Sequence, residues 1–172
     1  MEKKPISNIV AGSVIAGLII VYSIIVYFAG LQANQALSYV TYAILVLGVV
    51  YFVNAYGKAN DYRMSFGNLF AYGFKVTAFT ALVFIAFLII FNLIFPEFRE
   101  KIFEMMRQNL EKQGKLTDEQ IGSYVESMRK LFMVFIIAGT LFFFAIFGAI
   151  GGLIGAAVTK RNPPSSPFEN PV

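Results

Sequence analysis

The chain has 172 residues, of which 58% are hydrophobic and only 14% are charged, and its mean hydropathy is +0.68. A soluble domain carries about a quarter charged residues, so this composition indicates a membrane protein. Cysteine and histidine are absent, which excludes disulfides and thiol nucleophiles and removes the usual ligands of haem, zinc and copper. The net charge of +4 does not indicate nucleic acid binding, because the basic residues flank apolar segments.

The first two apolar segments, residues 9–30 and 36–56, contain no charged residue. A helix over residues 9–30 would measure about 33 Å, enough to cross a hydrocarbon core about 30 Å thick. A cleaved signal peptide also begins with lysines, but its apolar core is only about 7–15 residues long. We therefore predict two membrane-spanning helices, which the short link between them makes antiparallel neighbours.

The third apolar segment, residues 69–95, follows a turn that carries three charges (Lys58, Asp61 and Arg63). Aromatic residues and glycines alternate over residues 65–74, a pattern typical of the lipid headgroup level. Lys75 stands near the start of this span. A lysine inside a span is a candidate functional residue, but here its stem can reach the headgroups, and we favour that structural interpretation.

Residues 96–130 form the one long segment that could not lie inside a bilayer, and they predict a helical hairpin. Pro96 and Glu97 suit the first turn of a helix, and Gly114 is placed to end it. Thr117 and Gln120 have the spacing of a capping box that begins the second arm. One face of the first arm is apolar and is our candidate docking face: Phe98, Ile102, Met105, Met106 and Leu110.

The last apolar segment, residues 131–159, continues the apolar stripe of the second arm, so we expect one unbroken helix. It holds four glycines at GxxxG spacing (Gly148 with Gly152, and Gly151 with Gly155). Gly12 and Ala16 repeat a milder form in the first span. Small residues let helix backbones approach closely in lipid, so these six are predicted helix-packing positions, and the first and last spans are candidates for the tightest contact. Packing within the bundle is favoured over homodimerisation.

Four spans place both termini on one side of the membrane. That side carries net +4, whereas the hairpin carries seven basic and seven acidic residues. The positive-inside rule counts lysine and arginine, and the three short segments on the termini side are each net basic. We predict cytoplasmic termini, an outward-facing hairpin and a disordered tail over residues 162–172.

Several short motifs occur in a fixed order: Ser65-Phe66-Gly67, Gly73-Phe74, Pro96-Glu97, Thr117-Asp118-Glu119-Gln120-Ile121 after Gly114, and Lys160-Arg161. In this order and spacing the chain resembles, over nearly its whole length, a family of small four-helix membrane proteins from bacteria named domain of unknown function 4199. The family has no assigned activity or catalytic residues. The resemblance therefore implies location and architecture only.

The sequence predicts an all-α integral membrane bundle of four transmembrane helices, forming a single domain over residues 1–161, with an extramembrane amphipathic hairpin. We expect no enzyme activity, cofactor, metal or nucleic acid partner. The expected role is that of an accessory or interaction subunit of the bacterial inner membrane, whose hairpin docks a membrane protein partner, a second copy or the membrane surface. The alternative is a small oligomeric transporter or channel with a path near Lys75, Asn54 and Asn92, although no carboxylate lies in any span to relay protons.

Overall fold

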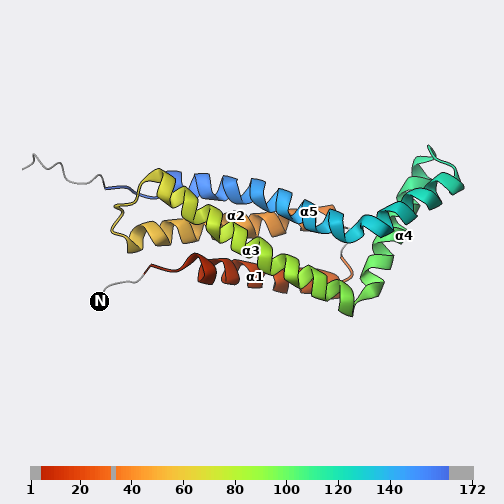
Figure 1. Cartoon of the computed structure of the whole chain (residues 1–172), viewed down its shortest axis with the longest axis horizontal. Coiled ribbons are helices and arrows are strands. Elements are labelled where there is room, and N and C mark those ends of the chain that lie inside the picture. The colour runs from red at the N-terminus through yellow and green to blue at the C-terminus, as the bar shows by residue number, and fades with distance from the viewer. Residues whose placement is uncertain (1–4, 32–33, 163–172) are drawn as a thin grey trace, which may run out of the picture. The chain divides into compact units, whose positions relative to one another are not determined.

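The computed structural model describes residues 5–31 and 34–162, and every regular element within these ranges is a helix (Figure 1). The helices are listed in chain order: α1 (Asn8–Phe28), α2 (Gln35–Ala59), α3 (Phe66–Ile94), α4 (Pro96–Gln113) and α5 (Asp118–Val158). The predicted all-α fold is confirmed. The lysines at positions 3 and 4, and the predicted disordered tail beyond residue 162, lie outside the described residues.

Four of these helices, α1, α2, α3 and α5, are long and apolar enough to cross a membrane. The longest, α5, has 41 residues and therefore measures about 60 Å, about twice the thickness of a hydrocarbon core. It runs without a break from the second arm of the hairpin to the end of the last apolar segment. The expected continuity of that arm into the fourth span is confirmed.

The helix that contains Lys75 begins earlier than its apolar pattern predicted. The sequence placed the third span at residues 69–95, whereas α3 already starts at Phe66. The hydroxyl oxygen of Ser65 accepts a hydrogen bond from the backbone N–H of Asn68 at 3.2 Å, a typical N-cap interaction. The aromatic and glycine-rich segment is therefore the first two turns of α3.

The described chain divides into two compact units, each with its own internal contacts. The first unit comprises the described residues up to Phe84 and from Phe142 onward, and the hairpin unit comprises residues 85–141. Helices α3 and α5 each contribute to both units. The predicted single domain over residues 1–161 stays a prediction, and composition shows no boundary where a helix continues from one unit into the other.

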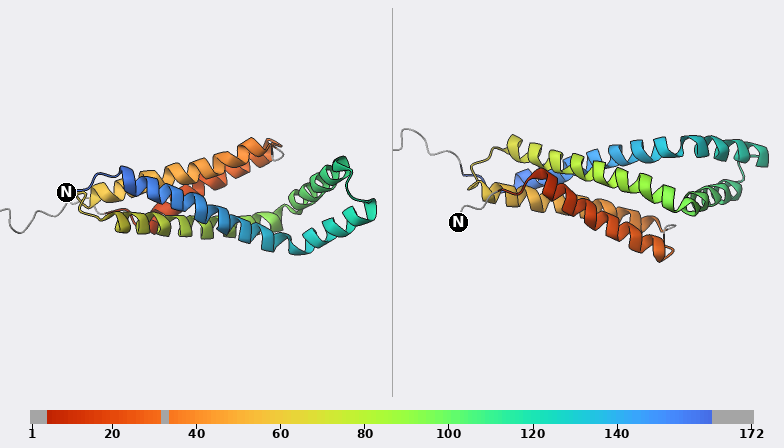
Figure 2. Two further views of the ribbon diagram at one scale, coloured as in Figure 1. Left: turned by 90° about the horizontal axis from the view of Figure 1, so that it is seen from above. Right: turned by 60° about the horizontal axis from the view of Figure 1, so that its bottom comes forward.

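Within the first unit, α1 and α2 lie side by side (Figure 2). The Tyr22 hydroxyl on α1 donates a hydrogen bond to the carbonyl of Leu37 on α2 at 2.8 Å. The described ends of the chain contact the start of α3 and the turn that precedes it. Tyr72 donates to the carbonyl of Ile6 at 2.9 Å, and the backbone N–H of Asn162 donates to the carbonyl of Tyr62 at 2.8 Å. Both ends therefore lie at the same end of this unit.

Candidate functional site

The two arms of the hairpin begin and end where the sequence predicted. Pro96 occupies the first turn of α4, and Gly114 ends it in the left-handed region with φ of 62°. The Thr117 N–H donates to the Gln120 side-chain oxygen at 3.0 Å, and the Gln120 N–H donates to the Thr117 hydroxyl oxygen at 3.3 Å. This reciprocal pair is the capping box, and it starts α5 independently of any membrane contact.

The hairpin has a small core of its own, built from large apolar side chains. Phe103 on α4 is 2% exposed, and Ile121 and Phe132 on α5 are also buried. The rings of Phe103 and Phe132 meet edge to face with centroids 5.2 Å apart. Burial of a phenylalanine side chain contributes about 1.5–3 kcal/mol, so these contacts are the main force that joins the two arms.

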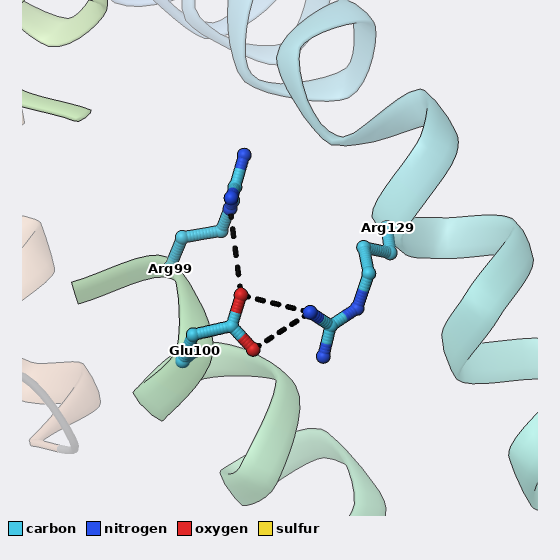
Figure 3. Close-up of polar contacts among 3 residues, drawn as sticks. All are labelled: Arg99, Glu100 and Arg129. Carbon is cyan, nitrogen blue, oxygen red and sulfur yellow. Dashed lines mark hydrogen bonds and ion pairs between the residues drawn. The ribbon is translucent and has the colours of Figure 1, made fainter. Parts of the chain in front are cut away.

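An ion pair crosses between the arms beside this core (Figure 3). Arg129 Nη1 lies 2.8 Å from Glu100 Oε1 and 2.7 Å from Glu100 Oε2, and its guanidinium carbon lies 4.8 Å from the centre of the Phe103 ring. Arg99 Nε approaches the same carboxylate at 3.7 Å. These side chains are almost half exposed, and exposed pairs contribute below about 1 kcal/mol. The pair therefore contributes more to the relative position of the two arms than to their stability.

The five residues of the candidate docking face all lie on α4 and are all partly exposed: Phe98, Ile102, Met105, Met106 and Leu110. Phe98 makes an edge-to-face contact with Phe91 inside the hairpin unit. These five residues form an apolar arc on α4. The neighbouring Phe103 lies at the edge of this arc but packs against α5 instead. The arms therefore use one edge of the arc for their own core and leave the remainder partly accessible. Its docking role stays a prediction.

A groove of about 500 Å³ follows the charged side of the hairpin. Phe103 contributes to its lining between Glu100, Glu104, Arg107 and Arg129. Three acidic and two basic residues line it, and Arg107 is already paired with Glu111 at 2.9 Å. Nothing in this mixture selects one ligand charge over the other.

The glycines of α5 contact α2 and α3. A Cβ added to Gly148 would collide with the side chain of Thr77. One added to Gly151 would lie 3.1 Å from the carbonyl oxygen of Val46, and one added to Gly155 would lie 2.9 Å from Val53 Cβ. These are the close backbone approaches expected of small residues in lipid.

The remaining predicted packing residues show that α1 and α5 do not direct their small residues at each other. A Cβ on Gly12 would lie 3.0 Å from the Val76 carbonyl oxygen of α3, and one on Gly152 would lie 3.3 Å from the ring of Phe70, also on α3. Ala16 is fully buried. The atoms nearest to the predicted glycines of the first and last spans therefore belong to α2 and α3. Spacing identifies a small face but not its partner.

Three further glycines of the first unit pack closely although no sequence pattern marked them: Gly48, Gly57 and Gly73. A Cβ on Gly48 would lie 2.8 Å from Ile15 Cγ1. A Cβ on Gly73 would lie 3.0 Å from Gly152 Cα, and Gly57 faces Thr159. Each of these glycines stands alone rather than at GxxxG spacing, so no pattern marked it. Thr80 was similarly unremarkable, yet its hydroxyl lies 3.3 Å from the Gly12 carbonyl oxygen on α1 and 2.9 Å from that of Val76.

Lys75 lies in the first unit with its side chain exposed and lines a cavity of about 540 Å³. The cavity lies between the start of α1, the end of α2 and the first turns of α3; its polar lining includes Ser7, Asn8 and Asn68. Asn54 is not part of its lining, and Asn92 belongs to the hairpin unit. Within residues 5–31 and 34–162, no three acidic side chains gather as metal ligands.

Four helices able to span a membrane, combined with a charged helical hairpin that has its own core, define a multi-pass membrane protein of the four-helix type. The chain belongs to the family described as protein of unknown function (DUF4199), whose sequence model matches residues 11–161. No curated protein and no solved structure matches the chain.

Proposed function

We propose that this protein is a non-enzymatic accessory or interaction subunit of the bacterial inner membrane, and that its hairpin docks a membrane protein partner. The observation that carries the proposal is the division of the α4 apolar arc. Phe103 is used in the hairpin core, whereas Ile102, Met105 and Met106 stay partly exposed beside it. The hairpin is already folded, so a partner that binds its exposed apolar edge loses little conformational entropy in ordering this surface.

A protein partner fits this surface better than the lipid surface does. Residues 96–130 carry seven basic and seven acidic side chains, and an anionic membrane surface attracts segments with an excess of lysine and arginine. The charged rim around the apolar edge instead matches the polar rim of a protein interface. Methionine side chains are flexible and adapt to the shape of a partner.

The proposed orientation has both termini in the cytoplasm and the hairpin on the outer face. The described ends of the chain lie beside the α2–α3 turn, through the contacts of Ile6 with Tyr72 and of Asn162 with Tyr62. Lys58, Arg63, Lys160 and Arg161 belong to the same end, with Asp61 as the acidic residue of that turn. This excess of basic residues in short segments supports a cytoplasmic position.

The test is co-purification of the full chain in mild detergent after cross-linking, with quantitative mass spectrometry. The Met105→Glu/Met106→Glu variant places two charges on the candidate docking face, and we expect it to lose a partner that the unaltered chain retains in stoichiometric amount. The matched control is Gln108→Glu/Ser123→Glu, which adds the same charge at exposed positions outside that face. Equal recovery of the partner with both variants would remove the docking proposal.

One observation favours the alternative of a small oligomeric transporter or channel, namely that Lys75 borders a cavity. That proposal requires a path across the membrane, for which Asn54 and Asn92 are the other polar candidates. A homo-oligomer without any stoichiometric partner would favour it. An unchanged transport phenotype in a Lys75→Ala variant would count against it.

A further inference from the structure

The cavity beside Lys75 has the positive charge and the hydrogen-bond donors of a phosphate site, and it lies at the expected level of the lipid headgroups. We propose that it binds the phosphate group of a membrane phospholipid. Its volume of about 540 Å³ lies within the range of about 300–1,000 Å³ typical of small-molecule sites. The proposal is independent of the docking role of the hairpin, because the cavity belongs wholly to the first unit.

The electrostatics of this cavity favour an anion. Among the described residues, Lys75 is the one charged residue of its lining, and no carboxylate lines it. The ion pairs within the described ranges all lie in the hairpin, so Lys75 keeps its ammonium group available. A lysine ammonium offers three donors and binds phosphate through charge-assisted hydrogen bonds.

Further donors come from the start of α1 and from α3. The Ser7 hydroxyl oxygen accepts a bond from the Val10 N–H at 3.2 Å. The N–H groups of Asn8 and Ile9 precede the first intrahelical bond, in which the Ala11 N–H donates to the Ser7 carbonyl. Ser7 and Asn8 line the cavity together with the Asn68 amide. These groups add hydrogen-bond donors to the ammonium group of Lys75. The positive end of the α1 dipole also favours an anion.

Two tyrosines form an ordered wall of this cavity. The rings of Tyr56 on α2 and Tyr72 on α3 stack with centroids 4.0 Å apart at an angle of 8°. The Tyr72 hydroxyl bonds the Ile6 carbonyl at 2.9 Å, which ties the segment before α1 to α3. The aromatic faces offer apolar contact to the glycerol and the first acyl carbons of a lipid, while polar groups lie beside them.

The depth of Lys75 in the membrane matches that of phospholipid phosphates. Residues 76–95 carry no charge, and their length of about 30 Å in a helix equals the hydrocarbon thickness. Lys75 therefore stands where the hydrocarbon ends and the headgroups begin. Tyrosine is enriched at this level, which agrees with the positions of Tyr56 and Tyr72. A phospholipid therefore explains the site better than a soluble phosphate ester, which shares the same chemistry.

The test is a titration of the purified full chain in detergent with phosphatidylglycerol, followed by native mass spectrometry. We expect saturable binding that is weaker by about tenfold in Lys75→Gln, the loss typical of one charge-assisted hydrogen bond. Lys75→Arg should retain most of the affinity. The matched control is Lys160→Gln, which removes an exposed lysine that is not part of the cavity lining. The thermal midpoint of each variant shows that it remains folded.

Three comparisons decide the outcome. Equal affinity of Lys75→Gln and the unaltered chain would overturn the proposal, as would an equal loss in Lys160→Gln. Diacylglycerol, which lacks the phosphate, should not compete, and its equal binding would also overturn the proposal. Displacement of the lipid by glycerol 3-phosphate at a similar concentration would support a phosphate site but would overturn its assignment to a lipid.

Discussion

In the first unit, glycines as well as large side chains bring helices together, whereas in the hairpin unit large side chains alone do so. Gly148, Gly151 and Gly155 place the backbone of α5 against α2 and α3. In the hairpin unit, by contrast, Phe103 and Phe132 fill the space between α4 and the same helix α5. A Cβ added to Gly139, in the part of α5 that belongs to the hairpin unit, would find nothing within 4 Å. One helix thus uses two packing modes along its length.

The difference follows the solvent that each part is expected to meet. Lipid tails are as apolar as leucine, so helices in a bilayer gain little from burying large side chains and associate by close van der Waals packing. In water the same burial is the dominant favourable term. The close glycine packing of the first unit fits the lipid expected around it, and the burial of Phe103 fits the water expected around residues 96–130.

The largest loss of stability is expected for Phe103→Ala. Removal of a fully buried phenylalanine side chain costs about 3–5 kcal/mol, and here it also removes the ring beneath the Arg129 guanidinium. Hydrogen exchange measured by mass spectrometry should rise across α4 and the start of α5 and stay unchanged in α1 and α2. Faster exchange in α1 and α2 as well would show that the two units do not have separate stabilities.

A smaller loss of stability is expected for Gly148→Ala in the first unit, which adds a methyl group where Phe103→Ala removes a ring. The added methyl collides with the side chain of Thr77. This side chain cannot rotate away freely, because it is β-branched and its hydroxyl donates a hydrogen bond to the Gly73 carbonyl oxygen at 3.0 Å. Overpacking of this kind costs about 1–3 kcal/mol, measured as a lower thermal midpoint in detergent.

Two controls make the Gly148 prediction specific. Gly139→Ala on the same helix meets nothing within 4 Å and should be neutral or slightly stabilising, because alanine favours helix. Addition of Thr77→Ala to Gly148→Ala should recover part of the loss. A loss of stability in Gly139→Ala equal to that in Gly148→Ala would remove close packing as the explanation.

A third, weaker effect is expected at the ion pair between the arms. Glu100→Gln removes the partner of Arg129, and because both side chains are almost half exposed the cost should stay below about 1 kcal/mol. The loss should shrink at high salt, where exposed charges are screened. It can be followed by hydrogen exchange of the hairpin at low and high salt. A loss that does not change with salt would show that Glu100 acts by packing.

The smallest effect concerns Glu126, which is fully exposed on α5. The hydrogen bond from Lys130, at 3.0 Å, and the charge of that lysine lower the pKa of Glu126 below its ordinary value of 4.5. Because the folded-state pKa is the lower one, the pair stabilises α5 above pH 4.5, and this contribution is lost as the pH falls through the folded-state pKa. Exchange rates of Glu126→Gln and the unaltered chain should differ slightly at neutral pH and converge in acid. A difference that grows in acid would contradict this sign.

The fold was largely predictable because its signals are local. Uncharged runs of sufficient length mark the four spans, and Gly114 with the capping box of Thr117 and Gln120 marks the hairpin turn. The partners across helices were not predictable. The spacing of Gly148 and Gly152 reveals a small face, but whether that face meets α1 or α3 depends on the arrangement of all four helices.

The residues of the cavity were also beyond sequence reasoning, apart from Lys75. Ser7, Tyr56 and Tyr72 come from three separate elements and converge only after folding. The turn that leads into α3 is another example, because Asp61 and Tyr62 both adopt positive φ, 52° and 59°, which is uncommon outside glycine. No local pattern indicates such a turn.

The proposed topology, with residues 96–130 in water outside the cell and both termini in the cytoplasm, can be tested by single-cysteine labelling. The natural chain contains no cysteine, so each introduced thiol is the only target. We predict that a membrane-impermeant maleimide labels Ser123→Cys in intact cells, labels Lys160→Cys only after permeabilisation, and labels Leu18→Cys, whose position is exposed but within α1, in neither case. Protection of Ser123→Cys in intact cells, or labelling of Leu18→Cys, would contradict the account.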